Sequence, residues 1–144
     1  MANIVPDSFK TDLLKGTFNF DSSGGDTFKL ALYTDISGFS TSTTAYTTTN
    51  EVSSSGTGYT AAGNTLTNNG VAVASNIAYV DFADLTFSSV TLTADSALIY
   101  KSSASNEAVL VLDFGGDKTA TNGDFVIQFP TANSTNAIIR LGDA

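Results

Sequence analysis

The residues able to do chemistry in this sequence are almost all carboxylates, because its 144 residues include no histidine and no cysteine. This composition excludes Ser-His-Asp and Cys-His nucleophiles, thiolate metal sites and imidazole zinc ligands. Two close pairs, Asp113 with Asp117 and Asp81 with Asp84, remain as candidates for acid–base catalysis. The alternative is structural, because an Asp beside Gly-Gly accepts hydrogen bonds from the amides of a turn. We favour this interpretation, predict no catalytic residue and do not expect an enzyme.

An oxygen-rich cluster in the last third of the chain comes nearest to a metal site. Its members are Asp113, Asp117, Asn122 and Asp124. An EF-hand loop requires acidic or amide residues at alternate positions before a glycine, and this cluster lacks that spacing. Residues 113–115 read Asp-Phe-Gly, as in a kinase magnesium loop, but the other kinase motifs are missing. We expect no metal ion and no cofactor, with calcium at this cluster as the alternative.

The charge balance narrows the range of partners. Fourteen acidic residues against six basic ones give a formal charge of −8 and a pI near 4.1, so phosphate backbones and anionic membranes should repel the chain. The longest apolar stretch, residues 108–112, is far shorter than the roughly 20 residues that cross a bilayer as a helix. The start, MANIVPDSFK, has no secretory pattern. We expect neither nucleic acid nor membrane as a partner.

Strands must position these side chains, because only one stretch of the sequence is typical of a helix. Asp7 or the following serine can cap it, Phe9 and Leu13 fall on one face with Leu14 beside them, and Gly16 can end it. This pattern predicts a helix of about two turns.

The first strands alternate with polar segments. Phe28, Leu30 and Leu32 alternate with residues 29, 31 and 33, which predicts a half-buried strand. Residues 34–76 are dominated by Ser, Thr, Asn and Gly and predict long loops, with short strands at 46–52 and 59–67. Disorder is the alternative, and we favour strands because Thr and Tyr are typical of them.

The second half is richer in apolar residues, and polar turns separate its predicted strands. These strands are residues 77–82, 85–92, 97–100, 109–114, 125–129 and 137–141. The rhythm predicts an all-β, single-domain antiparallel β-sandwich or jelly-roll-like fold with a short N-terminal helix. Residues 1–20 form the helical arm of this domain and residues 21–144 the sandwich.

The surface composition favours contact with other proteins. Ser and Thr make up about a quarter of the chain and charged residues only 14%, which predicts a neutral exterior rich in hydroxyl groups. The predicted interface residues are Phe9, Leu13, Leu14, Tyr46, Tyr59 and Arg140. The alternative places Phe9 and Leu13 as a plug of the sandwich, the tyrosine rings in the core and Arg140 as an ordinary surface charge.

Several strings along the chain resemble those of small virion structural proteins of tailed bacteriophages. The similar segments are residues 8–20, 27–34, 44–68, 79–102 and 108–141, almost the whole chain. The recurring strings are F-K-x-x-L-L at 9–14, L-A-L-Y-T at 30–34, A-L-I-Y at 97–100 and L-D-F-G-x-D-K at 112–118. A fifth string, G-Y-T-A-G-G at 58–63, departs from the family because Ala62 replaces a glycine.

The resemblance implies a capsid decoration or cement protein, made in the bacterial host cytoplasm and carried on the outer capsid surface. Its implied partners are the major capsid protein and other copies of itself, often as a trimer at local threefold positions. Two alternatives remain: a tail, neck or fibre-associated virion component, and a host-surface or glycan-binding adhesin that uses loops 37–76 as its tip.

Overall fold

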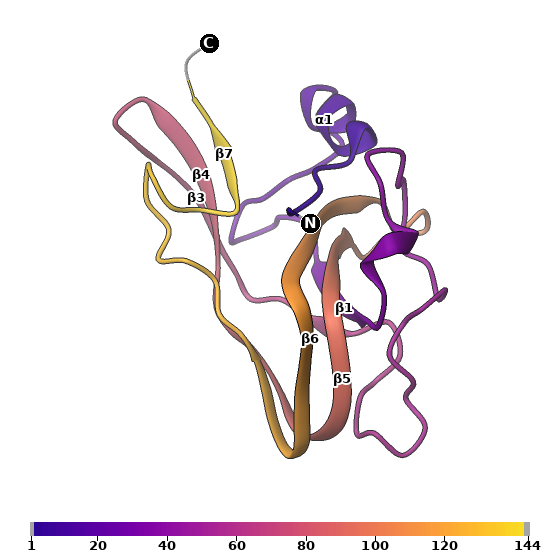
Figure 1. Ribbon diagram of the computed structural model, residues 1–144. Helices are drawn as coiled ribbons and strands as arrows, with labels where there is room; N and C mark the ends of the chain where they lie inside the picture. The colour runs from indigo at the N-terminus through magenta and orange to yellow at the C-terminus, as the bar shows by residue number, and fades with distance from the viewer. Residues whose placement is uncertain (1, 143–144) are drawn as a thin grey trace.

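The structure, a computed structural model, describes residues 2–142 and contains two antiparallel sheets (Figure 1). The larger sheet has the order β2-β1-β5-β6, and its strands are β1 (Phe28–Tyr33), β2 (Asn64–Thr65), β5 (Leu85–Lys101) and β6 (Ala108–Ile127). The smaller sheet has the order β3-β4-β7, with β3 (Asn68–Ala74), β4 (Ile77–Phe82) and β7 (Ile139–Leu141). The helices are α1 (Asp7–Leu14) and the short 3-10 helix η1 (Ile36–Gly38). The predicted all-β class with a short N-terminal helix is confirmed.

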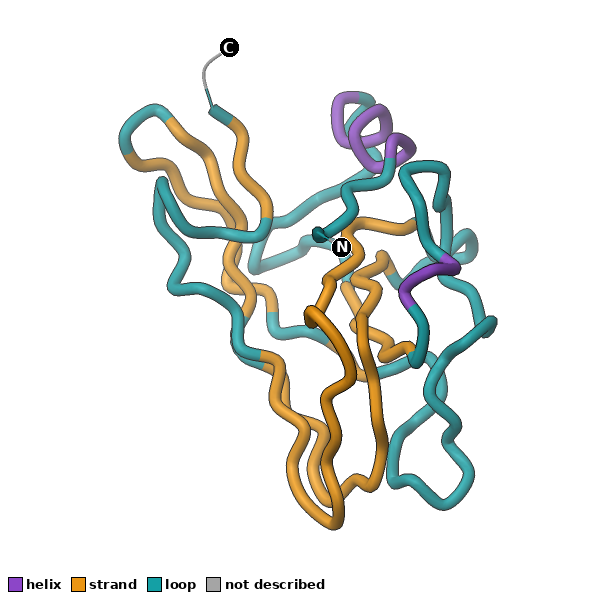
Figure 2. Tube along the Cα trace, in the orientation of Figure 1, coloured by secondary structure: helices purple, strands orange, loops and turns teal. Residues whose placement is uncertain are grey.

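Two very long strands, β5 and β6, replace four of the predicted short ones. They contain 17 and 20 residues and pair along most of their length. Asp113 pairs with Ser96 and Lys118 with Ala94, so residues 114–117 lie opposite Asp95 alone. Such bulges bend and twist a strand pair, and Figure 2 shows the ribbon turning back on itself at the bottom of the molecule. The turns predicted at 93–96 and 115–124 were wrong, because their glycines and polar residues form bulges.

The helix ends as predicted, but it begins at Asp7, earlier than a cap at Asp7 or Ser8 implies. Pro6 occupies the N-cap position and no side chain caps the helix, so the predicted cap at Asp7 or its neighbour was wrong. Gly16 has a φ of 77° and donates its amide to the carbonyl of Leu13, which confirms the predicted end. Proline has no side-chain acceptor for the free amides of the first turn, but its φ of −59° and ψ of 143° are the non-helical values usual for the residue that precedes a helix.

Strand β1 is buried on both faces, although its alternation predicted a half-buried strand. Phe28, Leu30 and Leu32 belong to the main core, which also receives residues from both arms of the β5–β6 ribbon. Ala31 and Tyr33 face a second core cluster, completed by Phe39, Leu98, Tyr100, Ala108 and Val111. The prediction failed because the polar segment after β1 packs back over its second face.

Residues 34–67 contain less regular structure than predicted, whereas residues 68–76 contain more. No strand covers 46–52, where only isolated bridges join Tyr33 to Glu51 and Ala45 to Glu107. The predicted strand at 59–67 shrinks to the two residues of β2. Strand β3 was not predicted, because Asn68, Asn69 and Gly70 are typical of turns and its short apolar run follows them.

Phenylalanine rings attach the helical arm to the main core. The ring of Phe9 contacts that of Phe18 at 5.0 Å between centroids, and Phe20 stacks on Phe28 at 4.5 Å. Phe28 in turn meets Phe82 of β4 at 5.7 Å, so one row of rings links α1, β1 and the smaller sheet. Aromatic pairs at these separations contribute beyond the area they bury.

Two glycines in the loop region have nearly the same positive φ but differ in how closely other atoms approach them. Gly56 and Gly63 have φ values of 72° and 73°, but a methyl group at Gly56 would meet nothing within 4 Å. A methyl group at Gly63 would lie 1.8 Å from the carbonyl oxygen of Leu30 in β1. We expect Gly56→Ala to lower the free energy of unfolding by about 1–2 kcal/mol and Gly63→Ala by about 3–5 kcal/mol. Equal losses in urea denaturation would contradict this account of the β1–loop contact.

Candidate functional site

The six predicted interface residues occupy different environments. Phe9 and Tyr59 are buried in the main core, and Tyr46 is half-buried against the ring of Tyr100. Leu13 is half-buried, whereas Leu14 is 86% exposed. Arg140 is exposed and donates to the carbonyl of Ser134 at 2.9 Å. The burial of Phe9 agrees with the alternative that it plugs the core, and a partner contact by the exposed residues stays a prediction.

The exposed members of this set lie along one apolar groove between α1 and the smaller sheet. Figure 1 shows these two elements on opposite sides of the upper end of the molecule. Two adjoining hollows of about 290 and 110 Å³ separate them and share Leu13, Ile139 and Leu141 in their walls. We call these two hollows together the helix–sheet groove.

The register of the smaller sheet explains why this groove is apolar. Val71 pairs with Val80 and Val73 with Ala78, while β7 sets Ile139 beside Val80 and Leu141 beside Ala78. Directly paired residues share one face of a sheet. One face is therefore aliphatic throughout, with the members Val71, Val73, Ala78, Val80, Ile139 and Leu141.

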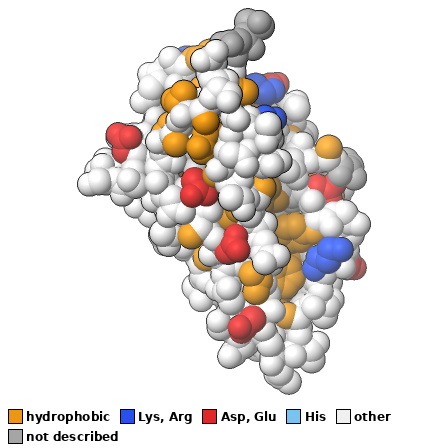
Figure 3. All heavy atoms as spheres, turned by 90° about the vertical axis from the view of Figure 1, so that its left-hand side faces the viewer, with side chains coloured by type: hydrophobic (Ala, Val, Ile, Leu, Met, Phe, Trp, Pro, Cys, Tyr) orange, Lys and Arg blue, Asp and Glu red, His pale blue; other side chains and the backbone are white. Residues whose placement is uncertain are grey.

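Much of this aliphatic surface is open to solvent. Val73 is 70% exposed and Leu141 is 55% exposed, in addition to Leu14 on the helix. Figure 3, which views the molecule from the side of the smaller sheet, also shows hydrophobic side chains exposed at that side. Contiguous exposed apolar surface rimmed by polar residues is typical of an interaction site.

The charged residues of the groove are basic, although the chain as a whole is acidic. Lys10 and Arg140 are the charged side chains in its walls. Lys10 pairs with Asp7 at 2.7 Å, and both partners are exposed, so this pair contributes little stability. The groove is thus one place where a chain of charge −8 presents no net negative charge.

A second hollow lies along the outer edge of β6. It has a volume of about 690 Å³ and is lined by both arms of the bent strand, by residues 128–130 and by Ala137 and Ile138. Phe114 and Phe129 in its walls are half-buried. We call this hollow the β6-edge cleft.

Three of the carboxylates considered for catalysis or metal binding, Asp81, Asp84 and Asp113, have structural contacts. Asp113 accepts a hydrogen bond from the amide of Gly115 at 2.8 Å, as the turn interpretation predicted. Asp84 accepts from the amide of Phe129 at 2.8 Å, and Asp81 from the side chain of Asn69 at 2.9 Å. Within residues 2–142, no group of three His, Cys, Asp or Glu residues is placed to hold a metal ion. These contacts give the three carboxylates structural roles: Asp81 lies in β4, Asp113 lies in β6 beside its bulge, and Asp84 directly precedes β5.

A polar network centred on the Glu51 carboxylate was not predicted from the sequence. One oxygen accepts from the Tyr59 hydroxyl at 2.8 Å and from the Ala62 amide at 2.6 Å, and the other accepts from the Tyr46 hydroxyl at 2.6 Å. Two further hydroxyls bond to the same loop, Tyr33 to the carbonyl of Thr47 and Tyr100 to that of Ala62, both at 2.7 Å. The available signal was a lone glutamate in a hydroxyl-rich loop with tyrosines on either side.

Burial in this network changes the ionisation of the tyrosines. Desolvation, together with the nearby Glu51 charge, raises the pKa of Tyr100 to about 12. Desolvation also raises the pKa of Tyr33, Tyr46 and Tyr59 well above the ordinary tyrosine value, and Glu51 adds to each shift. With pKa values raised in this way, the phenol groups stay protonated and act as hydrogen-bond donors that fix the loop. They are not suited to proton transfer near neutral pH.

The network predicts a large difference between the two glutamates of the chain. Glu51→Gln leaves one carbonyl oxygen for three donors, so we expect a loss of about 2–4 kcal/mol in the free energy of unfolding. Glu107 accepts from the hydroxyl of Ser103 in the β5–β6 connection, and Glu107→Gln is the matched control. We expect the control to cost about 1 kcal/mol. Equal urea midpoints for the two variants would show that the Glu51 network is not a principal support.

The raised tyrosine pKa values predict a loss of stability in alkali. The folded state holds its phenol protons above pH 10, where an unfolded tyrosine has lost its proton, so stability is complete below about pH 10 and falls above it. Each of the four tyrosines contributes a slope of up to about 1.4 kcal/mol per pH unit. Urea denaturation between pH 9 and 12, beside tyrosinate absorbance of the folded chain, measures this effect. Ionisation of all tyrosines near pH 10 without unfolding would contradict it.

No helix within residues 2–142 has the length and apolar character needed to cross a bilayer. Comparison of the chain with protein-family models, with curated proteins and with solved structures found no match in any of the three.

Proposed function

We propose that this chain is a structural protein of a bacteriophage virion, most specifically a decoration or cement protein on the outer capsid surface. The observation that carries the proposal is the helix–sheet groove, where Leu14, Val71 and Leu141 are exposed in walls made largely of aliphatic side chains. The resemblance of the sequence strings to virion structural proteins is the reason for proposing a bacteriophage particle as the assembly.

The proposed mechanism is adhesion by burial of apolar surface. A neighbouring subunit that fills the groove removes aliphatic side chains from water and gains about 25 cal/mol for each Å² of apolar surface buried. The two walls come from segments far apart in the sequence, α1 near the start and β7 near the end. A partner bound between them therefore braces the helix against the smaller sheet.

The charge distribution supports an exterior position. A charge of −8 makes contact with packaged DNA unfavourable, whereas the groove itself presents Lys10 and Arg140. An acidic body with one apolar, basic-rimmed face is suited to binding a shell by that face alone. The implied partners are the major capsid protein and further copies of this chain.

The copy number separates a decoration protein from a tail, neck or fibre component, which is the second candidate. Quantitative mass spectrometry of purified particles should give between about one copy per three major capsid subunits and one copy per subunit. A ratio of a few per cent would move the protein to the tail, neck or fibres. The adhesin alternative receives less support, because the Glu51 network packs much of the loop region against β1.

The groove itself is tested by placing a charge in it. We expect Leu14→Glu to weaken binding of the purified chain to empty shells of its phage at least tenfold in a sedimentation assay. Because Leu14 is exposed, the substitution should change the free energy of unfolding of the protein by less than about 0.5 kcal/mol. Thr48→Glu, an exposed loop position, is the matched control and should bind as the parent chain does. Full binding by Leu14→Glu would exclude the groove as the shell contact.

A further inference from the structure

The outer edge of β6 is a second interaction element, on the other side of the strand from β5. Strand β6 ends the order β2-β1-β5-β6, so it has a partner strand on one side only. The walls of the β6-edge cleft include the unbroken runs 112–114 and 124–130. Side chains of consecutive strand residues point to opposite faces, so a hollow lined by every residue of such a run faces the backbone edge.

Two contacts of the N-terminal arm show which backbone groups of β6 point outward. The amide of Val111 donates to the carbonyl of Ile4 at 2.9 Å, and Ile4 returns the same bond at 2.9 Å. The amide of Asp113 donates to the side-chain oxygen of Asn3 at 2.8 Å. Residues 111 and 113 therefore face away from β5, and the arm already pairs with this edge at one point.

At the other end of the cleft, the amide of Phe129 donates to Asp84, which directly precedes β5, at 2.8 Å. Residue 129 therefore faces β5. Because the direction of the peptide groups alternates along an extended chain, the N–H and C=O groups of Val126 and Gln128 point away from β5 and into the cleft. Among residues 2–142, no backbone hydrogen bond joins either of them to a further segment.

We propose that the 124–128 edge, formed by residues 124–127 of β6 and by Gln128 directly after it, binds an extended polypeptide segment of a partner, neutral or basic in charge, as an added strand. Main-chain hydrogen bonds to Val126 and Gln128 supply the pairing, as in other cases of strand addition to a sheet edge. The half-buried rings of Phe114 and Phe129 offer apolar contact to alternate side chains of the segment. The 124–128 edge lies outside the helix–sheet groove, although Ile138 lines both hollows, and the proposal does not depend on the capsid function.

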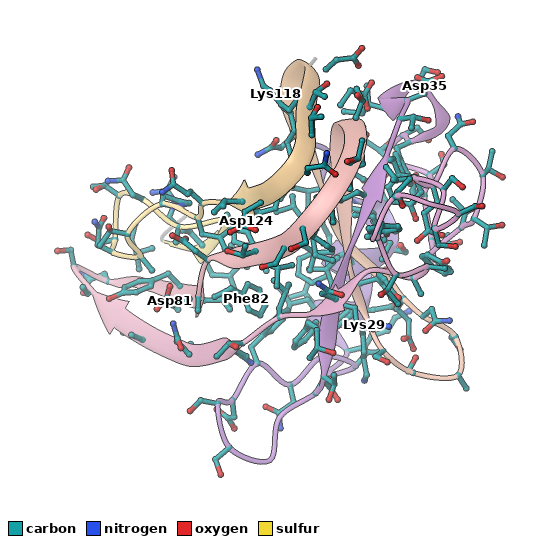
Figure 4. All side chains as sticks on the ribbon, turned by 90° about the horizontal axis from the view of Figure 1, so that it is seen from below. Lys29, Asp35, Asp81, Phe82, Lys118 and Asp124 are labelled. Carbon is teal, nitrogen blue, oxygen red and sulfur yellow. The ribbon has the colours of Figure 1, made fainter. Side chains whose placement is uncertain are left out.

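Three features favour a peptide over another ligand. An unpaired edge strand is a template for a further strand, and the N-terminal arm shows that this edge accepts one. The cleft also continues from the pairing point of the arm to the free 124–128 edge. The charge of −8 favours a segment without acidic residues. Figure 4 shows Lys118 and Asp124 at separate points along β6, with Lys118 close to the bend.

The test uses a displayed library of random nine-residue peptides selected on the purified full chain. We expect enriched peptides that alternate apolar and polar residues and carry Lys or Arg. Binding should slow hydrogen exchange at the amides of Val126 and Gln128 and leave the groove residues unaffected. No enrichment, protection confined to the helix–sheet groove, or affinity for a glycan array in place of peptides would each overturn the proposal.

Two measurements then examine the hydrogen bonds directly. Val126→Pro removes one outward N–H while leaving the β5 ladder intact, and we expect at least a tenfold loss of affinity for a selected peptide. Val126→Ala keeps the N–H and should lose much less. N-methylation of the peptide leaves the protein unaltered and can be applied to either of two sets of alternate amides, the odd-numbered or the even-numbered. We expect methylation of one set to abolish binding and methylation of the other set to have little effect. Equal binding of the two methylated peptides would overturn strand addition. The Leu14→Glu variant should still bind the selected peptide, so a failure of peptide binding can be told apart from a failure of the capsid proposal.

Discussion

The carboxylate of Glu51 is the constraint on which the irregular half of the structure depends. Residues 34–63 contain no strand and only one short 3-10 helix, yet they form the cover of the second face of β1. A buried backbone without regular structure needs other partners for its polar groups. Three donors converge on Glu51, and the Tyr59 hydroxyl also accepts from the amide of Leu32 in β1 at 3.1 Å. One side chain thereby fixes the loop to the sheet.

The bent β5–β6 ribbon performs the corresponding task for the regular half. Its two arms contribute to one core, because Ile99 and Val109 lie on one arm and Phe87 and Phe125 on the other. A straight ribbon of this length would leave one arm without a covering layer. The three register shifts between Phe87 and Ser96 lie between the arms and bend the ribbon, and the fold thus obtains two layers from a single pair of strands. The smaller sheet then closes only part of the opening, and the helix–sheet groove is what remains.

Local patterns predicted those parts of the fold that depend on neighbouring residues in the chain. The helix with its stop at Gly16, strand β1 and strand β4 follow directly from spacing and turn formers. The long strands did not, because a Gly-Gly or Asn-Gly pair in sequence is compatible with either a turn or a bulge, and only pairing with β5 decides between them. The Glu51 network also joins residues from separate segments. The sequence predicted Leu14 and Arg140 as members of the candidate surface. The aliphatic wall could not be predicted, because it depends on the register in which β3, β4 and β7 pair.

The pairing of Ile4 with Val111 also has a consequence for how the chain folds during synthesis. Ile4 leaves the ribosome before Val111, so it finds its strand partner only after more than a hundred further residues have been made. Contacts of such sequence separation form late and slow the folding of β-proteins. Until then the apolar residues of the arm and of β1 stay exposed in the nascent chain, where aggregation competes with folding.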